Sequence, residues 1–542
     1  MAGKNIELEK EQNLIRVFRV KSADIRINLT KMNMPNENGN NHPPSTTSDL
    51  EVNTDMEAPS QKKSNSATNQ TGLYASVTIH DKSEEINTIK SHVKGILQIA
   101  TPIILSEVFQ NTLPIIDLAF VGNLGKEELA AAALATVWFN LWNVSMFGFL
   151  TAIDTILAQA CGAEEWEKFG MWTGASLVIT GGVSVLVMAV VATCGPAMIL
   201  FGQQEDLAKM AGAFALRLLP GMIPFYLFKV LTKYLQTQNI LLPSVFIGIL
   251  SNIINVIANY LFIHTFGLGL NGAPWATTLT RILQLILVIV YMYWKKSSTL
   301  KKSWPSFQKQ NMTNEKLRLF WKLGIFGALS LTSEGWSFEI TTILAGLLGT
   351  VALDAHIVTL SIATFIFLSF PFAIGIATSI RVGQFIGEGK ANDAKRTFTV
   401  SMGFASAVQI LFMVILIPCG PYLGKLFSND VDVIETVTRL IPVSAIFMLG
   451  DAIHANAVGA CRGLGRQNLS LALNTVGFWV LAVPSGALLT FVFDFGVSGL
   501  WWGFNIGIYS AAVIGFVLLY FYIDWNNETI KATKRISTIG HN

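Results

Sequence analysis

The sequence has 542 residues, of which 51% are hydrophobic and only 13% charged, about half of the ~25% that soluble domains carry. With a mean hydropathy of +0.49, this composition excludes an ordinary soluble enzyme. The net charge of +3 excludes a strongly basic nucleic-acid-binding protein, and the four cysteines lie too far apart for a disulfide framework or a zinc site. The sequence therefore predicts a polytopic membrane protein.

The N-terminal part of the chain differs from the rest. The stretch 33–70 is rich in Asn, Ser, Thr and Pro and has almost no aromatic residues. Such a segment cannot bury enough apolar surface to offset the loss of chain entropy on folding. It also lacks the apolar core of a secretory signal peptide. We therefore predict that residues 1–91 form a disordered cytosolic tail.

Twelve apolar segments follow, each long enough to cross about 30 Å of hydrocarbon as a helix. They predict an all-α membrane protein with six helices in an N-terminal lobe (92–295) and six in a C-terminal lobe (317–525). A basic cytosolic linker (296–316) joins the lobes, and a cytosolic tail (526–542) ends the chain. The predicted spans are 94–121, 130–160, 169–200, 207–237, 241–265, 272–294, 317–347, 354–382, 395–424, 434–462, 470–493 and 499–524.

The distribution of Lys and Arg predicts the orientation, because short cytosolic loops carry an excess of these residues. With the N-terminus inside, the basic cluster 295–302 and residues such as Lys168, Arg381 and Lys390 fall in cytosolic connections. The opposite loops carry few basic residues, diluted by acidic ones. Both termini are therefore predicted to be cytosolic.

The two halves of the membrane region look like copies of each other. Four short patterns recur in the same order at offsets of 222 to 227 residues, among them Gln159-Ala-Cys-Gly162, which recurs as Gln384-Phe-Ile-Gly387. Because each half has an even number of spans, both enter the membrane from the same side. The sequence thus predicts a parallel repeat with a cavity between the halves, which favours alternating-access transport.

Motifs for enzymatic chemistry are missing from the sequence. There is no phosphate-binding loop for ATP, no zinc-protease motif and no evident Ser, His and Asp set. We therefore expect a protein that is not an enzyme and has no cofactor or bound metal, and whose transport is passive or driven by an ion gradient.

Charged residues within the spans are informative, since each costs about 2.5–3.5 kcal/mol at the bilayer centre unless it is shielded. Glu334 lies some seventeen residues into its span, about 25 Å along a helix and beyond the reach of snorkelling. Without a basic neighbour, burial disfavours its charged form, so it can exchange a proton near neutral pH. The alternative is a neutral acid with one interhelical hydrogen bond. The acidic and basic residues placed within spans are Asp117, Asp154, Lys229, Glu334, Glu339 and Asp451.

The other charged positions allow two interpretations each. Asp154 is close to the interface, which favours capping of a nearby turn. Lys229 can either snorkel to the headgroups or face the cavity. Asp451 lies as deep as Glu334, and we expect its partner to be His454, one helical turn on. The ring of His454 fits proton handling or a hydrogen bond to a backbone carbonyl equally well.

Several segments resemble one known family. The segment 333–348 (SEGWSFEITTILAGLL), the segment 377–389 (ATSIRVGQFIGEG), the segment 152–163 and the run Cys461-Arg-Gly-Leu-Gly-Arg-Gln467 are similar to motifs of the multidrug and toxic compound extrusion (MATE) family. The eukaryotic branch is the most similar, and the resemblance extends over about 92–525. It implies two V-shaped six-helix lobes and a transporter that exports organic solutes in exchange for protons.

The resemblance also implies roles for individual residues. Glu334, Glu339 and Asp451 match the acidic cluster of the C-terminal half, and Asp117 matches an acid in the first span of several prokaryotic members. Ser361 stands where animal members often carry a further acid, so attraction for dications should be weaker. We expect a monomer in a lipid bilayer, at the plasma membrane or a vacuolar or lysosomal membrane, that binds small organic, cationic or xenobiotic solutes and no nucleic acid.

Two alternatives to proton-coupled export remain open at this point. Coupling to sodium would place Asp117 and its neighbours at the centre of the mechanism. A flippase for lipid-linked sugars would need Arg or Lys in the cavity to bind pyrophosphate, whereas the deep charges read from the sequence are mainly acidic.

Overall fold

The computed structural model describes residues 68–295, 298–307 and 313–537. The chain divides into two compact units, Met1–Gly72 and Leu73–Asn542, and the description below concerns the second unit. Residues 1–67 of the predicted tail lie outside the described residues. For residues 68–91 the prediction of disorder is wrong, because helix α2 begins at Thr68. No Pro or Gly lies between Leu73 and Lys94, so nothing interrupts the helix before the membrane span.

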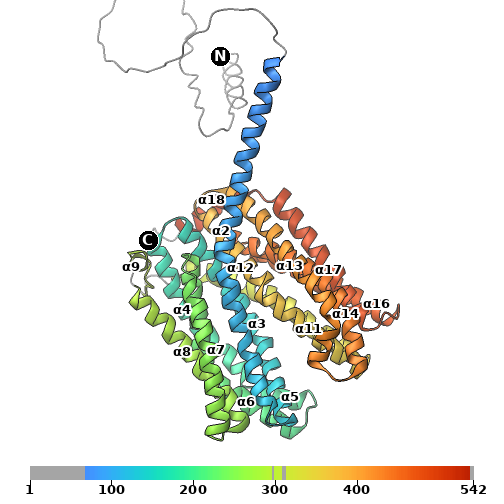
Figure 1. Ribbon diagram of the computed structural model, residues 1–542. Helices are drawn as coiled ribbons and strands as arrows, with labels where there is room; N and C mark the ends of the chain where they lie inside the picture. Colours follow the sequence, from blue (N-terminus) through green and yellow to red (C-terminus); the bar gives the residue numbers. More distant parts are fainter. Residues whose placement is uncertain (1–67, 296–297, 308–312, 538–542) are drawn as a thin grey trace, which may run out of the picture. The chain divides into compact units, whose positions relative to one another are not determined.

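Helices make up all the regular elements in the described part of the chain. The predicted third span is interrupted at residues 192–193, so it contains a long and a short helix, α4 and α5. Figure 1 shows the arrangement of the helices of both lobes. The N-terminal lobe contains α2 (Thr68–Gly122), α3 (Lys126–Gly162), α4 (Trp166–Val191), α5 (Cys194–Leu200), α6 (Glu205–Thr237), α7 (Leu242–Tyr260) with a π-helical extension (Leu261–Thr265), and α8 (Gly272–Trp294).

The C-terminal lobe follows a linker that contains the short helix α9 (Ser298–Lys302). A helix packed onto the lobe, α18, occupies most of the segment that the sequence assigned to a tail. The elements of this lobe are α10 (Asn314–Gly346), α11 (Thr350–Ser369), α12 (Pro371–Gly387), α13 (Ala391–Phe427), α14 (Val431–Leu464), α15 (Gln467–Asn474) with a π-helical extension (Thr475–Ala482), α16 (Val483–Phe491), α17 (Val497–Val517) with a π-helical extension (Leu518–Tyr522), and α18 (Trp525–Ser537).

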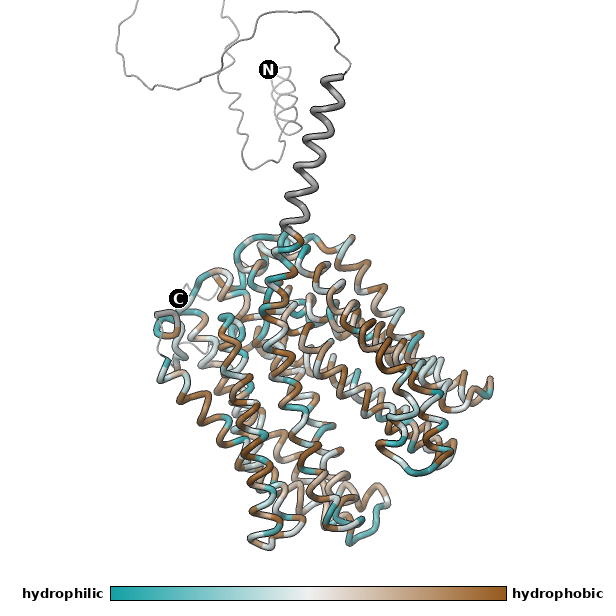
Figure 2. The backbone as a smooth tube through the Cα atoms, viewed as in Figure 1, coloured by the Kyte–Doolittle hydropathy of each residue, from teal (hydrophilic) through white to brown (hydrophobic). Residues whose placement is uncertain are grey.

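Eleven helices of the described residues are long and apolar enough to cross a membrane. The predicted seventh span, α10, is a 33-residue helix but falls outside this set, because its carboxylates and hydroxyl groups lower its hydropathy. The twelve-helix count is therefore not fully confirmed. Figure 2 shows apolar residues along the bodies of the helices and polar residues gathered at many of their ends.

The first helix of each lobe packs against the other lobe. The contact between lobes is called the seam below. On α2, Ile96, Ala100 and Ile103 share one buried cluster with Ile374 and Ala377 of α12. On the other side, α10 approaches α3 so closely that a Cβ on Gly148 would lie 2.3 Å from the carbonyl oxygen of Gly327. Away from the ends where α3 and α12 meet, the two lobes diverge (Figure 1).

The repeated Gln-x-x-Gly motifs meet at the seam. A Cβ on Gly162 would lie 1.9 Å from the carbonyl oxygen of Gln384, and a Cβ on Gly387 would lie 2.2 Å from that of Gln159. Each glycine therefore admits the backbone of the other motif, and no larger residue fits without moving it. The repeat predicted from sequence thus corresponds to a reciprocal contact in space. A second recurring pattern, Arg217-Leu-Leu-Pro220 and Arg439-Leu-Ile-Pro442, agrees with this, since Pro220 lies in α6 and Pro442 in α14, each the fourth predicted span of its lobe.

The glutamine side chains of the same motifs add reciprocal hydrogen bonds. Gln159 donates through Nε2 to the carbonyl oxygen of Gly463 at the end of α14, 2.9 Å away. Gln384 donates through Nε2 to the carbonyl oxygen of Thr237 at the end of α6, 3.0 Å away. Both acceptors lie in the last turn of a helix, where carbonyl groups lack intrahelical partners.

Helix α18 reinforces the same region through one buried carboxylate. Glu528 is 1% exposed and accepts hydrogen bonds from Arg466 at 2.5 Å and from Lys531 at 2.9 Å. Burial alone would raise the pKa of Glu528, but the hydrogen bonds and charges of Arg466 and Lys531 outweigh it and lower this pKa. Arg535 donates to Gln159 Oε1 at 3.2 Å and thereby connects α18 to the N-terminal lobe.

We predict that Gly162→Ala and Gly387→Ala each loosen the seam, because the added methyl group collides with a backbone carbonyl. Overpacking of this kind costs about 1–3 kcal/mol, so the melting temperature in detergent should fall by several degrees. Gly182→Ala in α4 is the matched control, since nothing lies within 4 Å of its Cβ position. Equal melting temperatures for all three variants would contradict the proposed packing.

A second prediction concerns the pH dependence of Glu528. Because its folded pKa is lowered, its charge stabilises the protein above the unfolded pKa, about 4.3, and this contribution disappears as the pH falls through the folded pKa. Wild-type protein should therefore have a higher melting temperature than Glu528→Gln at pH 7. The difference in melting temperature should shrink below about pH 4. Glu435→Gln, which removes an exposed ion pair with Arg439, should show little difference at any pH. If the difference in melting temperature between wild type and Glu528→Gln persisted at low pH, the stabilising role of the Glu528 charge would be contradicted.

Candidate functional site

Three of the predicted site residues lie together inside the C-terminal lobe. Glu334 comes from α10, and Asp451 and His454 come from α14; their exposed fractions are 8%, 4% and 1%. The carboxylates of Glu334 and Asp451 are close enough to repel each other. Asn474, at the end of α15, joins the group through hydrogen bonds and was not identified from the sequence.

Asn474 connects the members of this group. Its Nδ2 donates to Glu334 Oε2 at 3.0 Å and to the carbonyl oxygen of Ser330 at 2.8 Å. Because the carbonyl oxygen can only accept, the Asn474 amide orientation is fixed, and its Oδ1 accepts from His454 Nε2 at 2.7 Å. In the neutral ring the proton therefore lies on Nε2, which leaves Nδ1 as a buried acceptor that no other described residue contacts by a hydrogen bond.

The predicted pairing of Asp451 with His454 is wrong. His454 Nε2 is bonded to Asn474, and one carboxylate oxygen of Asp451 is buried without any partner among the described residues. The spacing of one helical turn placed the two residues on one face, but the neighbouring helix supplied a closer partner. A buried carboxylate oxygen without a donor costs about 1–3 kcal/mol, so this position is suited to a proton or a cation.

Glu334 also has a cationic neighbour that the sequence analysis missed. The buried guanidinium of Arg462, near the end of α14, interacts electrostatically with Glu334 and with Asp154. The predicted span 434–462 ended at Arg462, so the sequence analysis did not count this residue among the charges within spans. The site therefore contains two carboxylates and one guanidinium within electrostatic range.

The other predicted acid of this helix, Glu339, does not join the group. It is exposed, five residues beyond Glu334. The intervening Phe338 packs in an aromatic cluster, with ring centroids 4.7 Å from Phe504 and 5.8 Å from Phe478. Ser361, which stands where an acid was expected, donates its hydroxyl to Ile357 of its own helix and supplies no charge.

Asp117 forms a separate polar group inside the N-terminal lobe. Its Oδ1 accepts hydrogen bonds from Asn255 at 3.1 Å and from Asn259 at 2.8 Å, both on α7. Its Oδ2 accepts from the hydroxyl of Thr277 on α8. The guanidinium of Arg281, also on α8, lies within electrostatic range of this carboxylate and stacks on Phe139 and Phe225.

The two remaining charged residues that the sequence analysis placed in spans of the N-terminal lobe, Asp154 and Lys229, each form an ion pair. Asp154 binds Lys233 of α6 with both oxygens at 2.6 Å, so the interpretation as a capping residue is wrong. Lys229 is 8% exposed and lies 3.4 Å from Glu107 of α2, so it does not snorkel to the headgroups. Glu107 was missed, although an acid inside the apolar run 94–121 was visible in the sequence.

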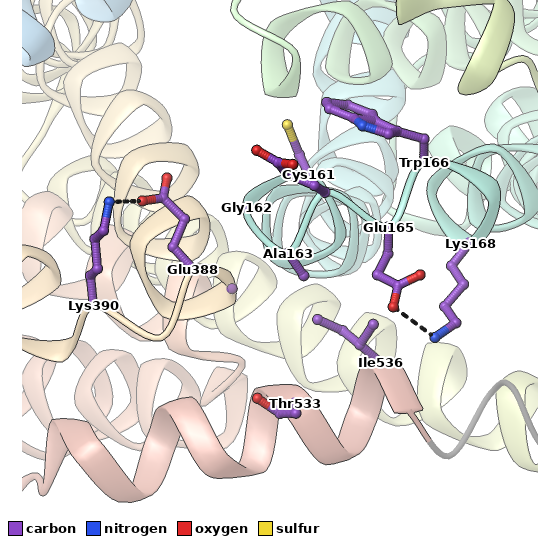
Figure 3. Close-up of a pocket in the computed structure, with 12 residues that line it drawn as sticks. Cys161, Gly162, Ala163, Glu165, Trp166, Lys168, Glu388, Lys390, Thr533 and Ile536 are labelled. Atoms are coloured by element: carbon purple, nitrogen blue, oxygen red, sulfur yellow. Dashed lines mark hydrogen bonds and ion pairs between the residues drawn. The ribbon is translucent and has the colours of Figure 1, made fainter. Parts of the chain in front are cut away.

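A pocket of about 690 Å³ lies at the seam, between the end of α3, the start of α4, the end of α12 and α18 (Figure 3). Two ion pairs border it, Glu165 with Lys168 at 3.3 Å and Glu388 with Lys390 at 2.8 Å. With Glu164 also in its lining, the pocket carries three carboxylates against two ammonium groups. None of the predicted site residues lines it.

This geometry defines a class of protein. Two similar helical lobes meet along a seam in the membrane, and each encloses its own buried group of polar and acidic residues. This architecture is that of a polytopic membrane transporter built from a duplicated helical unit. The comparison with known sequences and structures identifies the family.

The chain belongs to the MatE family, whose model matches residues 102–261 and 328–488, one segment in each lobe. Multidrug and toxin extrusion protein 1 of Xenopus tropicalis is 30% identical over 449 residues, which cover 82% of this chain and 76% of that protein. Protein DETOXIFICATION 16 of Arabidopsis thaliana is 28% identical and covers 84% of this chain and 93% of its own. These relatives are transporters rather than enzymes.

A solved structure supports the fold. The eukaryotic MATE transporter AtDTX14 is 27% identical to this chain and superimposes with a TM-score of 0.78, over 83% of this chain and all of that one. The family resemblance and the helical membrane fold predicted from the sequence are therefore confirmed.

We predict that Asn474→Ala lowers the stability of the C-terminal lobe. The substitution leaves Glu334 and His454 without a buried hydrogen-bond partner, which costs about 1–3 kcal/mol. Thermal unfolding in detergent measures this loss. Asn468→Ala, at an exposed position of the same helix, is the control and should leave the melting temperature unchanged. A similar melting temperature for the two variants would show that Asn474 does not hold this group together.

Proposed function

We propose that this protein is a secondary active antiporter that exports organic, cationic or xenobiotic solutes in exchange for protons. The observation that carries the proposal is the buried pair Glu334 and Asp451, in which one Asp451 oxygen has no partner among the described residues. Two carboxylates that repel each other inside a low-dielectric site are not both ionised unless a cation accompanies them. The pair therefore binds either protons or a cationic solute.

Competition for one pair of carboxylates has the chemical consequence of antiport. A proton that arrives from one side of the membrane neutralises the pair and releases the cation. Loss of the proton to the other side restores the negative charge and the affinity for the next cation. Two similar lobes that meet at one end supply a structural basis for alternating access.

Aromatic residues at the contact between the lobes support a preference for organic cations. Trp336 lies two residues from Glu334 on α10 and is 37% exposed. It meets Trp142 of α3 edge to face, with ring centroids 6.2 Å apart, so the two rings join the lobes. An exposed indole face attracts quaternary or protonated amines. The names of the relatives, multidrug and toxin extrusion proteins and a DETOXIFICATION protein, favour the same class of substrate.

Sodium coupling is a second candidate, and the Asp117 group is the observation that favours it. A carboxylate surrounded by Asn255, Asn259 and Thr277 offers the oxygen ligands that a hard cation prefers. Oδ1 of Asn259 is buried and has no hydrogen-bond partner in the described part of the chain. The nearby guanidinium of Arg281 opposes a bound cation, because it already compensates the charge of Asp117. Proton coupling at Glu334 is therefore the preferred proposal.

The finer predictions from the sequence are retained as part of the proposal. The end of the helices that carries Lys168, Arg381 and Lys390 faces the cytosol, with both termini on that side. The protein acts as a monomer without a cofactor, at the plasma membrane or a vacuolar or lysosomal membrane. A flippase for lipid-linked sugars is disfavoured, because the deep lysines are bound by acids, Lys229 by Glu107 and Lys233 by Asp154.

We predict that Glu334→Gln abolishes proton-driven exchange while the protein remains folded, because glutamine keeps the size of the side chain but cannot ionise. The measurement is uptake of a fluorescent organic cation into proteoliposomes under an imposed pH gradient, from about pH 6 to 8.5. Asp451→Asn should weaken transport and shift its pH optimum, and Glu339→Gln should have a smaller effect. Glu435→Gln, at an exposed position of α14, is the control.

The same assay distinguishes proton coupling from sodium coupling. Transport by Glu334→Gln at the wild-type rate, with unchanged pH dependence, would overturn the proton-coupling proposal. If uptake then required sodium at fixed pH and was lost in Asp117→Asn, the second candidate would replace it.

A further inference from the structure

Arg462 places a positive charge inside the contact between the lobes. The residue is 5% exposed and lies in the last turn of α14, and its Cζ atom is 5.6 Å from the ring centroid of Phe372 on α12. Its backbone carbonyl accepts a hydrogen bond at 2.5 Å from the hydroxyl of Thr155 on α3. The last turn of α14 is therefore fixed to the N-terminal lobe at this residue. Because arginine stays protonated in proteins, the buried side chain keeps its charge.

The guanidinium of Arg462 interacts electrostatically with one acid of each lobe, Asp154 of α3 and Glu334 of α10. The first of these acids already has a cationic partner, because Lys233 Nζ lies 2.6 Å from both oxygens of Asp154. Glu334 has no such partner, and its hydrogen bond comes from the neutral amide of Asn474. Glu334 is therefore the acid that is left to compensate the charge of Arg462.

The other titratable groups around Arg462 supply no second negative charge. Cys461 and His454 of its own helix interact with it electrostatically, but a buried thiol and an imidazole carry no negative charge at neutral pH. Asp451, further along the same helix, interacts with Glu334. The charge of Arg462 is thus compensated while Glu334 is ionised, and it loses this compensation when Glu334 takes up a proton.

We propose that Arg462 couples the proton state of Glu334 to the opening of the seam. This inference rests on the proposed function, in which Glu334 exchanges protons. While Glu334 is ionised, the two opposite charges compensate each other inside the closed seam. A proton on Glu334 leaves a buried guanidinium without a free counter-charge, which is unfavourable in a low-dielectric interior. Separation of the lobes relieves this cost, because the last turn of α14 then meets water.

Such a coupling gives the transporter a rule that antiport requires. A carrier that changes its orientation while it is empty lets the solute flow down its own gradient and wastes the proton gradient. An empty site with ionised Glu334 holds Arg462 in place and keeps the seam closed, whereas a protonated site permits the lobes to separate. Arg462 is in this sense a positioning residue, because protons and solute bind at the carboxylates of Glu334 and Asp451.

The first test measures transport by the full-length protein in proteoliposomes. One assay follows accumulation of a fluorescent organic cation under an imposed pH gradient, and the other follows its equilibration down its own gradient without a pH gradient. Arg462→Gln should reduce the accumulation about tenfold but equilibrate the cation at a rate near that of wild type. Arg462→Lys keeps the charge and should restore most of the accumulation. Arg439→Gln, which changes an exposed arginine of the same helix, is the matched control and should behave like wild type.

The pH profile supplies a readout that a purely structural role would not change. With equal pH on both sides, Arg462→Gln should move the pH of half-maximal exchange upward by about one unit, because a carboxylate that loses a nearby cation holds its proton to higher pH. Arg462→Lys and Arg439→Gln should keep the profile of wild type.

A double-mutant cycle of melting temperatures in detergent tests the compensation itself. Glu334→Gln leaves the guanidinium without its counter-charge and should lower the melting temperature. Adding Arg462→Gln to this variant should recover most of the loss, whereas Arg462→Gln alone should lower the melting temperature of wild type. The double variant also keeps the test decisive if Arg462→Gln alone does not fold. An arginine with a purely structural role would lower the melting temperature in both backgrounds.

The outcomes separate this inference from the proposed function. Full accumulation and an unchanged pH profile in Arg462→Gln, while Glu334→Gln still abolishes exchange, would overturn the role of Arg462 and leave the proposed function standing. An equal loss of accumulation and equilibration in both Arg462 variants, or an additive loss of melting temperature in the double variant, would also overturn the coupling. Transport by Glu334→Gln at the wild-type rate would overturn the proposed function itself.

Discussion

The structure of both lobes depends on one close contact, in which two Gln-x-x-Gly motifs place each glycine against the backbone of the other. Helices in a membrane gain little from burying apolar surface against each other, because the lipid is equally apolar. Close backbone approach and interhelical hydrogen bonds supply the association instead. At the seam, Gly162 and Gly387 allow the approach, and Gln159 and Gln384 donate hydrogen bonds across it. A duplicated sequence therefore supplies both halves of a reciprocal contact.

This contact is also suited to being broken and remade. The acceptors are carbonyl groups in the last turns of α14 and α6, which have no intrahelical donor and can bind water when the lobes separate. Helix α18 stabilises the closed arrangement as well. Arg535 of this helix donates a hydrogen bond to Gln159, and Glu528 of the same helix pairs with Arg466. The end of the lobes at which the motifs meet is thus held by several modest interactions rather than by one large apolar surface.

The sequence predicted the fold well and the site only in part. Apolar runs and a constant offset between repeats depend on local composition, so the helices and the duplication were readable from the sequence. The pairing of side chains depends on the rotation of one helix against another, so it could not be predicted from the sequence. Lys233 and Asp154 are 79 residues apart, and Lys229 and Glu107 are 122 apart. For the same reason the sequence predicted that His454 pairs with Asp451 on its own helix, whereas its hydrogen-bond partner is Asn474 on α15.

The two lobes share a fold but differ in how their charges are compensated. In the N-terminal lobe, Glu107, Asp154 and Asp117 lie beside Lys229, Lys233 and Arg281 respectively. In the C-terminal lobe, Glu334 interacts electrostatically with Arg462, whereas an oxygen of Asp451 has no hydrogen-bond partner among the described residues. An acid whose charge is compensated by a fixed cation gains little free energy by binding a proton or a second cation. A pair of acids whose charges are not fully compensated is stabilised by each proton or cation that binds. Duplication therefore provides the symmetric frame for movement, and the unequal charges provide the one lobe in which, on the proposed function, protons and solute compete.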